Sequence, residues 1–88
     1  MGQVGIVFRM MPVGVTTDMA AMAAAVRTGL PTEAKLRGVQ VKPIAFGIQA
    51  LLVSVVMPDA GGILHATEEA LRRIENVESV EVIEEGLL

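Results

Sequence analysis

The most informative segment of this 88-residue chain is Pro43-Ile44-Ala45-Phe46-Gly47-Ile48-Gln49-Ala50-Leu51-Leu52-Val53-Ser54-Val55-Val56-Met57. Its second part alternates between two faces. One face carries Leu51, Val53, Val55 and Met57, and the other carries Leu52, Ser54 and Val56. Side chains two residues apart in a strand point to the same side. Residues 48–57 therefore predict a β-strand.

Residues 43–47 precede that strand and predict a loop that displays Ile44 and Phe46, the latter one of only two aromatic residues in the chain. Pro43 fixes its own φ and biases Lys42 toward extended backbone, and Gly47 can adopt angles closed to other residues. The phenyl ring either packs over the sheet as a plug or contacts another molecule. A stiff apolar loop loses little entropy on docking, which favours a contact.

Residues Gln3 to Met11 also alternate between two faces and predict a first strand that ends at Pro12. Its inward side chains are Val4, Ile6, Phe8 and Met10. Thr16-Thr17-Asp18 supplies the N-cap of a helix. That helix repeats apolar residues at helical spacing and ends at Gly29 and Pro31; its inward face is Met19, Met22, Ala23, Val26 and Leu30. A second strand is expected from about Ala34 to Val41.

The sequence after residue 57 predicts a turn at Pro58–Gly62 and then a second helix, with Leu64, Thr67, Leu71 and Ile74 on one face. Asn76 is expected to stop it in a left-handed conformation. A last strand covers Val77 to Ile83, with Val80 and Val82 inward. The order β-α-β-β-α-β predicts an α+β, ferredoxin-like sandwich: one domain over residues 1–88, with a four-stranded antiparallel sheet and two helices on one face.

The composition of the chain excludes several kinds of site and of protein. Hydrophobic residues make up 52% of the chain, so a core can form, and the absence of cysteine excludes disulfides, thiolate metal sites and cysteine nucleophiles. No apolar run approaches the roughly 20 residues that a membrane helix needs, and the N-terminus lacks the pattern of a signal peptide. We expect a soluble cytoplasmic protein with no membrane contact.

Charge is unevenly distributed. Before Asp59 there are five basic and two acidic residues, and after it two basic and seven acidic residues. Such a dipole either steers a protein partner or reflects ordinary solvated faces. Direct nucleic-acid binding is not expected, because phosphate contacts need clustered cations.

Residues that could carry covalent chemistry are scarce. His65 is the only histidine, and a metal site needs three or four convergent ligands, so an exposed helix position is expected. The pairs Glu68-Glu69 and Glu84-Glu85 are adjacent in sequence and therefore diverge in space. Gly61-Gly62 precedes a helix without the lysine and hydroxyl residue of a phosphate-binding loop. We expect neither an enzyme nor a bound metal or cofactor.

The sheet face that no helix covers is predicted to carry an apolar stripe. It lacks the paired aromatics on which RNA-binding sheets stack bases. Its apolar stripe is Val7, Met11, Leu52, Val56 and Ile83. Exposed apolar area of this kind marks an interface, here including weak self-association, unless loops and the C-terminal Leu87-Leu88 cover it.

The chain resembles the archaeal elongation factor 1-beta family, the guanine nucleotide exchange factors for elongation factor 1-alpha. The block Pro43–Gly47 followed by Ala50-Leu51 is the specific part of the resemblance. Weaker matches are Met11-Pro12, Leu30-Pro31, Pro58-Asp59, Gly61-Gly62 and Val77–Val82. The resemblance implies a ferredoxin-like fold and non-covalent docking on the G domain of elongation factor 1-alpha, promoting the exchange of GDP for GTP.

Carried over by position, the resemblance implies a contact loop made of Pro43, Ile44, Ala45, Phe46 and Gly47. Charge adds Lys42 and Arg37 as candidate electrostatic neighbours. The alanine-rich first helix departs from the charged helix of relatives. The C-terminal lysine that eukaryotic relatives place near Mg²⁺ is absent from the ending Glu85-Gly86-Leu87-Leu88. The alternative is a ferredoxin-like regulatory domain that binds a small ligand or self-associates through its open sheet face.

Overall fold

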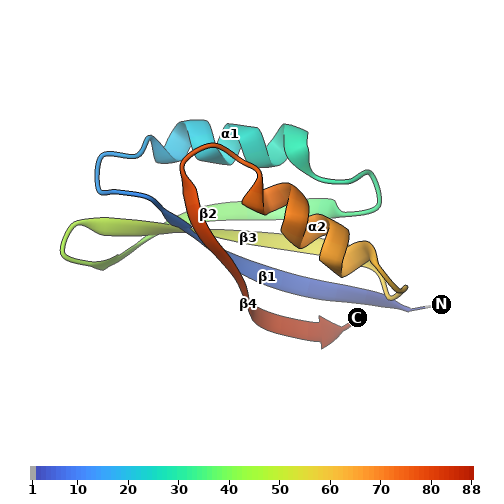
Figure 1. The fold of residues 1–88 in the computed structure, drawn as a ribbon. Helices are drawn as coiled ribbons and strands as arrows, with labels where there is room; N and C mark the ends of the chain where they lie inside the picture. The colour runs from blue at the N-terminus through green and yellow to red at the C-terminus, as the bar shows by residue number, and fades with distance from the viewer. Residues whose placement is uncertain (1) are drawn as a thin grey trace.

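Four strands form one sheet, and two helices cover one of its faces (Figure 1). The computed structural model describes residues 2–88. Along the chain the elements are β1 (Gln3–Pro12), α1 (Met19–Gly29), β2 (Lys35–Ala45), β3 (Ile48–Pro58), α2 (Ile63–Arg72) and β4 (Val77–Leu87). The strand order is β2-β3-β1-β4, with every neighbouring pair antiparallel. The predicted ferredoxin-like arrangement is confirmed.

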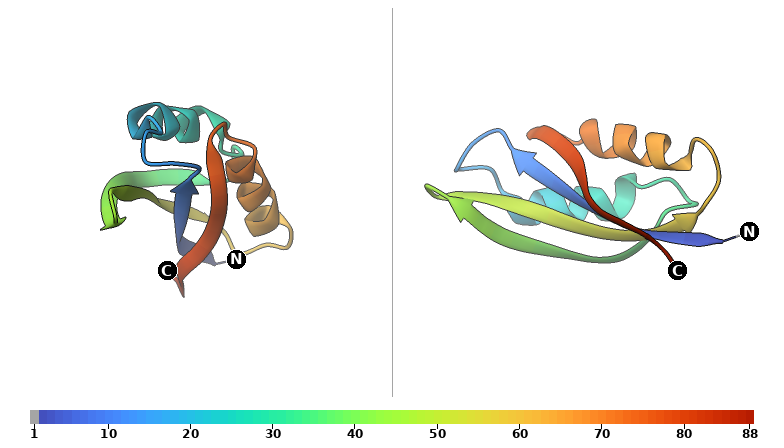
Figure 2. Two further views of the ribbon diagram at one scale, coloured as in Figure 1. Left: turned by 60° about the vertical axis from the view of Figure 1, so that its left-hand side comes forward. Right: turned by 90° about the horizontal axis from the view of Figure 1, so that it is seen from below.

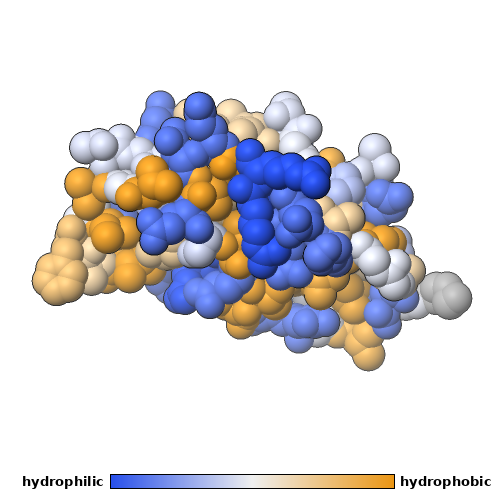
Figure 3. Space-filling view, in the orientation of Figure 1, coloured by the Kyte–Doolittle hydropathy of each residue, from blue (hydrophilic) through white to orange (hydrophobic). Residues whose placement is uncertain are grey.

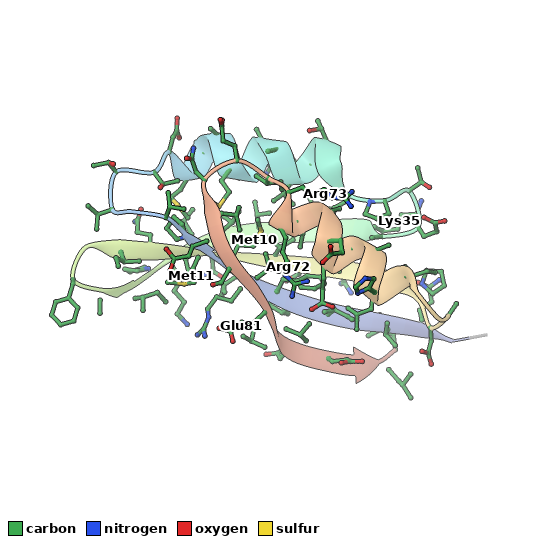
Figure 4. All side chains as sticks on the ribbon, in the orientation of Figure 1. Met10, Met11, Lys35, Arg72, Arg73 and Glu81 are labelled. Atoms are coloured by element: carbon green, nitrogen blue, oxygen red, sulfur yellow. The ribbon has the colours of Figure 1, made fainter. Side chains whose placement is uncertain are left out.

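The core lies between the sheet and the helices and is built from the alternation of the two central strands. Phe8 pairs with Val53 and Ile6 with Val55, and all four side chains are buried. The same alternation sends Met10 into the core and its neighbour Met11 to the other face (Figure 4). Helix α1 adds the buried residues Met19, Met22, Ala23 and Val26. The predicted inward faces of β1, β3 and α1 are confirmed.

Both helices begin as expected, but α2 ends early. The Asp18 carboxylate accepts a hydrogen bond from the Ala21 amide at 3.1 Å, which confirms the predicted N-cap of α1. Helix α2 ends at Arg72, before Ile74, because its last turn tightens: the Ile74 amide donates to the Leu71 carbonyl at 3.3 Å. Asn76 has φ 69°, so its predicted left-handed conformation is confirmed, although it lies in the turn that follows the helix.

The two edge strands are longer than the sequence predicted. Strand β2 continues past Val41 to Ala45, and β4 continues past Ile83 to Leu87. Both strands pair with one neighbour only, so their exposed residues need no alternating apolar pattern. An edge strand also accommodates Pro43, because one side of the strand makes no ladder hydrogen bonds.

The molecule is elongated, with principal extents of 42 × 20 × 17 Å. The β2–β3 hairpin projects past the rest of the sheet at one end (Figures 1 and 2). At the opposite end the start of β1 pairs with the end of β4, where Val4 is opposite Leu87. The turn of the hairpin therefore lies at the opposite end of the sheet from the C-terminal residues of the chain.

Candidate functional site

Phe46 and Gly47 alone form the turn between β2 and β3. Their φ angles are 55° and 80°, and positive φ at both central residues is the mark of a type I′ hairpin turn. Glycine adopts such angles freely, whereas a bulky residue rarely does. The first turn position therefore carries a side chain that its own backbone conformation disfavours.

The predicted loop at residues 43–47 is wrong in extent. Pro43, Ile44 and Ala45 belong to β2; Pro43 pairs with Gln49 and Ala45 pairs with Ile48, with a β-bulge between the two pairs. Cross-strand pairing with β3 therefore stiffens this segment, in addition to the proline ring. The display of Phe46 is confirmed, because its side chain is 98% exposed. The alternative of a plug over the sheet is excluded.

Other exposed apolar side chains gather at the same end of the molecule. We define the apolar tip as Val13, Val15, Ile44 and Phe46, all of them exposed. Val13 and Val15 belong to the β1–α1 loop, which lies beside the hairpin end (Figures 1 and 2). Hydrophobic surface is visible at this end in the space-filling view (Figure 3). Sequence reasoning missed the two valines, although their stretch Val13–Thr17 contains no charged residue.

The two basic residues predicted as electrostatic neighbours lie in different places. Lys42 is exposed on β2 opposite Ala50, four residues before the turn. Arg37 precedes Phe46 by nine residues, roughly 30 Å along the strand. It lines a hollow on the open face of the sheet. The structure thus groups residues 42–47 at the hairpin end and separates Arg37 from them.

That hollow has a volume of about 500 Å³, and Gly5, Val7, Ser54, Glu84 and Leu88 are among its lining residues. The Leu88 side chain lies 3.5 Å from the position that a β-carbon on Gly5 would take, so the C-terminal residue covers part of the face. The apolar stripe is half-buried at four positions and exposed at Ile83. Arg9 and Glu81 form an ion pair across this face, with Glu81 projecting from β4 (Figure 4).

The chemistry available for catalysis or metal binding is limited. His65 is exposed on α2, as predicted. Across residues 2–88 no three histidine, cysteine, aspartate or glutamate side chains gather in a way that could hold a metal ion. No helix in the described part of the chain is both long and apolar enough to cross a membrane. Phe8 is fully buried, so it is not available to stack on a base.

The sequence model of the family described as the EF-1 guanine nucleotide exchange domain matches residues 5–87. The chain belongs to this family. The exchange domain is 40% identical to elongation factor 1-beta of Methanoculleus marisnigri over 88 residues, covering all of both chains. It is 40% identical to elongation factor 1-beta of Methanosphaerula palustris over 84 residues, covering 96% of this chain and 95% of the relative. To the Halobacterium salinarum protein of the same name it is 36% identical over 88 residues, again covering all of both chains.

One solved structure is similar to this chain in its fold, and the similarity concerns the fold alone. The C-terminal domain of the MgtC protein from Mycobacterium tuberculosis superposes with a TM-score of 0.61 at 17% identity, covering 97% of this chain and 88% of that one. The resemblance to elongation factor 1-beta is confirmed by the family match and by these relatives. The exchange domain therefore has a role in guanine nucleotide exchange during translation elongation.

Proposed function

We propose that this exchange domain promotes the replacement of GDP by GTP on elongation factor 1-alpha in the cytoplasm. It acts by non-covalent binding to the G domain of that GTPase, and the end of the β2–β3 hairpin makes the contact. The observation that carries the proposal is the exposure of Phe46 at a turn whose backbone disfavours a phenylalanine. Pro43, Ile44, Ala45 and Gly47 hold and flank the ring, and Lys42 adds a positive charge at the base of the hairpin end.

Exchange of this kind requires no bond to be made or broken. A factor that binds the nucleotide-free GTPase more tightly than the GDP-bound form weakens GDP binding by the same factor, because the coupling between the two sites is reciprocal. Released GDP is then replaced by GTP from solution. The exchange domain therefore needs a surface that is complementary to one state of the GTPase.

The phenyl ring of Phe46 supplies binding energy of a useful size. Moving a fully exposed phenylalanine side chain into an apolar pocket stabilises a complex by about 1.5–3 kcal/mol. The paired strands on either side already order the backbone that carries the ring, so docking has to order little beyond the side chain itself. Aromatic anchors of this kind are over-represented among the residues that dominate binding energy in interfaces.

Release of a fluorescent GDP from elongation factor 1-alpha tests the proposal. The unaltered domain is expected to accelerate release in a saturable way. Phe46→Ala is expected to raise the half-saturating concentration roughly 10- to 150-fold, which corresponds to about 1.5–3 kcal/mol of lost binding. His65→Ala, an exposed change on α2, serves as the control and is expected to leave release unchanged.

An unchanged rate of GDP release at saturating unaltered protein would contradict the proposal. It would leave the alternative of a ferredoxin-like regulatory domain that binds a small ligand or self-associates through its open sheet face. Acceleration that survives Phe46→Ala would keep the exchange activity but would move the contact away from the hairpin end.

A further inference from the structure

Two valines outside the hairpin are largely exposed to solvent and take no part in the hydrophobic core. The Val13 side chain is 57% exposed and that of Val15 is 61% exposed, and both lie between β1 and α1. Neither belongs to the hydrophobic core, which already includes Met10 before the loop and Met19 after it. Burial within this chain therefore does not account for them.

The loop that carries these valines is anchored by backbone hydrogen bonds. The Val13 amide donates to the Asn76 carbonyl at 3.0 Å, and the Thr17 amide donates to the Gly14 carbonyl at 3.3 Å. Asp18, which caps α1, fixes the far end of the loop. Both valines are thus presented from a supported backbone, as Phe46 is presented by the hairpin.

The loop and the hairpin turn form one continuous surface. The Cγ1 atom of Val15 lies 3.8 Å from the position that a β-carbon on Gly47 would take. No charged residue occurs in the stretches 10–17 and 43–51 that carry the apolar tip. The nearest charges include Lys42, Asp18 and Glu75, the last of which adjoins the residue that bonds the Val13 amide. A surface of this kind fits an uncharged apolar pocket, whereas phosphate groups require clustered cations.

We propose that Val13 and Val15 form the second half of the contact with elongation factor 1-alpha, so that the whole apolar tip enters one apolar recess of the GTPase. This inference rests on the proposed function, because it assigns the same partner to both segments. Continuity with the hairpin turn selects that partner, because Val15 lies beside Gly47, the residue that follows Phe46. Self-association through the same four side chains is the competing outcome, and sedimentation equilibrium distinguishes it.

The variants Val13→Ser and Val15→Ser test the inference by titrating each protein against elongation factor 1-alpha loaded with fluorescent GDP. Each is expected to raise the half-saturating concentration about fivefold, as follows from losing the burial of the exposed part of one valine. Leu87→Ser is the matched control, because Leu87 is also an exposed apolar residue but lies at the opposite end of the sheet. It is expected to leave the titration unchanged.

A double variant separates direct contact from positioning of the ring. In the Phe46→Ala background, Val15→Ser is still expected to weaken binding, although by a different factor than in the unaltered protein, because two side chains that share one recess are coupled. No further loss in that background would show that Val15 acts only by supporting the turn, and would overturn the inference.

Three other results would also overturn it, and they distinguish it from the proposed function. Unchanged titrations for both valine variants alongside a weakened Phe46→Ala would leave the exchange proposal standing without the second contact. No acceleration by the unaltered domain would remove both. Loss of a dimer on Val15→Ser, measured by sedimentation equilibrium with GDP release unchanged, would assign the surface to self-association.

Discussion

Replacing Phe46 by asparagine is expected to stabilise the fold while removing its activity. The residue has φ 55° in a two-residue turn, where asparagine followed by glycine is the preferred pair. Phenylalanine is retained there against the local preference of the backbone. If the ring serves a partner and not the fold, the substitution relieves the backbone and loses no packing.

The size of the gain follows from two quantities. The left-handed conformation costs an ordinary L-residue about 1–2 kcal/mol, and asparagine adopts it much more readily. The ring is 98% exposed, so its removal sacrifices almost no buried area. We therefore expect a gain of about 1 kcal/mol in the free energy of unfolding, which corresponds to a rise in Tm of roughly 4–8 °C for a domain of this size.

Thermal unfolding followed by circular dichroism measures the gain, and release of fluorescent GDP from elongation factor 1-alpha measures the activity. Phe46→Ala is the matched control: it removes the same ring but keeps a side chain that is equally disfavoured in the left-handed region, so its Tm is expected to stay near that of the unaltered protein. A lower Tm for Phe46→Asn would show that the ring packs on the domain in solution. A higher Tm with GDP release undiminished would show that the ring does not contact the GTPase.

Two further substitutions test neighbouring parts of the structure. Phe8→Ala, at the fully buried phenylalanine of the core, is expected to lower the free energy of unfolding by about 3–5 kcal/mol; a loss in urea unfolding as small as that of Phe46→Ala would contradict the assignment of the core. Gly47→Ala is expected to lower the Tm by roughly 4–8 °C, because φ 80° costs alanine about 1 kcal/mol or more. An unchanged Tm would mean that the turn relaxes to another type.

The sequence predicted the central strands and the helices better than the edges of the sheet. In β1 and β3 one face meets the helices, so burial imposes an apolar alternation that is visible in residues 3–11 and 48–57. The edge strands β2 and β4 are mostly exposed, and their length is set by backbone pairing that any side chain permits. Their final residues, Pro43–Ala45 and Glu84–Leu87, therefore carried no signal of a strand.

The candidate site likewise has one part that the sequence predicted and another that it did not. The display of Phe46 followed from local information, namely a proline and a glycine that bracket a lone aromatic residue. The approach of Val15 to the turn depends on how the β1–α1 loop returns over the hairpin, and no local pattern encodes that approach. Arg37 shows the opposite case. Only four residues separate it from Lys42 in sequence, but the extended strand places it beside the C-terminal residues on the open face.

Because the hairpin projects from the sheet, this small domain can expose the Phe46 ring on a backbone that is already ordered. Strand β1 pairs with β3 from Pro58 as far as Leu51, and beyond that point β3 pairs with β2 alone. Residues 42–50 therefore form a two-stranded ribbon past the edge of the four-stranded sheet. An isolated ribbon of this kind is only marginally stable, but this one continues two strands of the sheet, and Val15 lies beside its turn. The arrangement places Phe46 at the projecting end of the hairpin yet on a supported backbone, which suits a side chain that reaches into a partner.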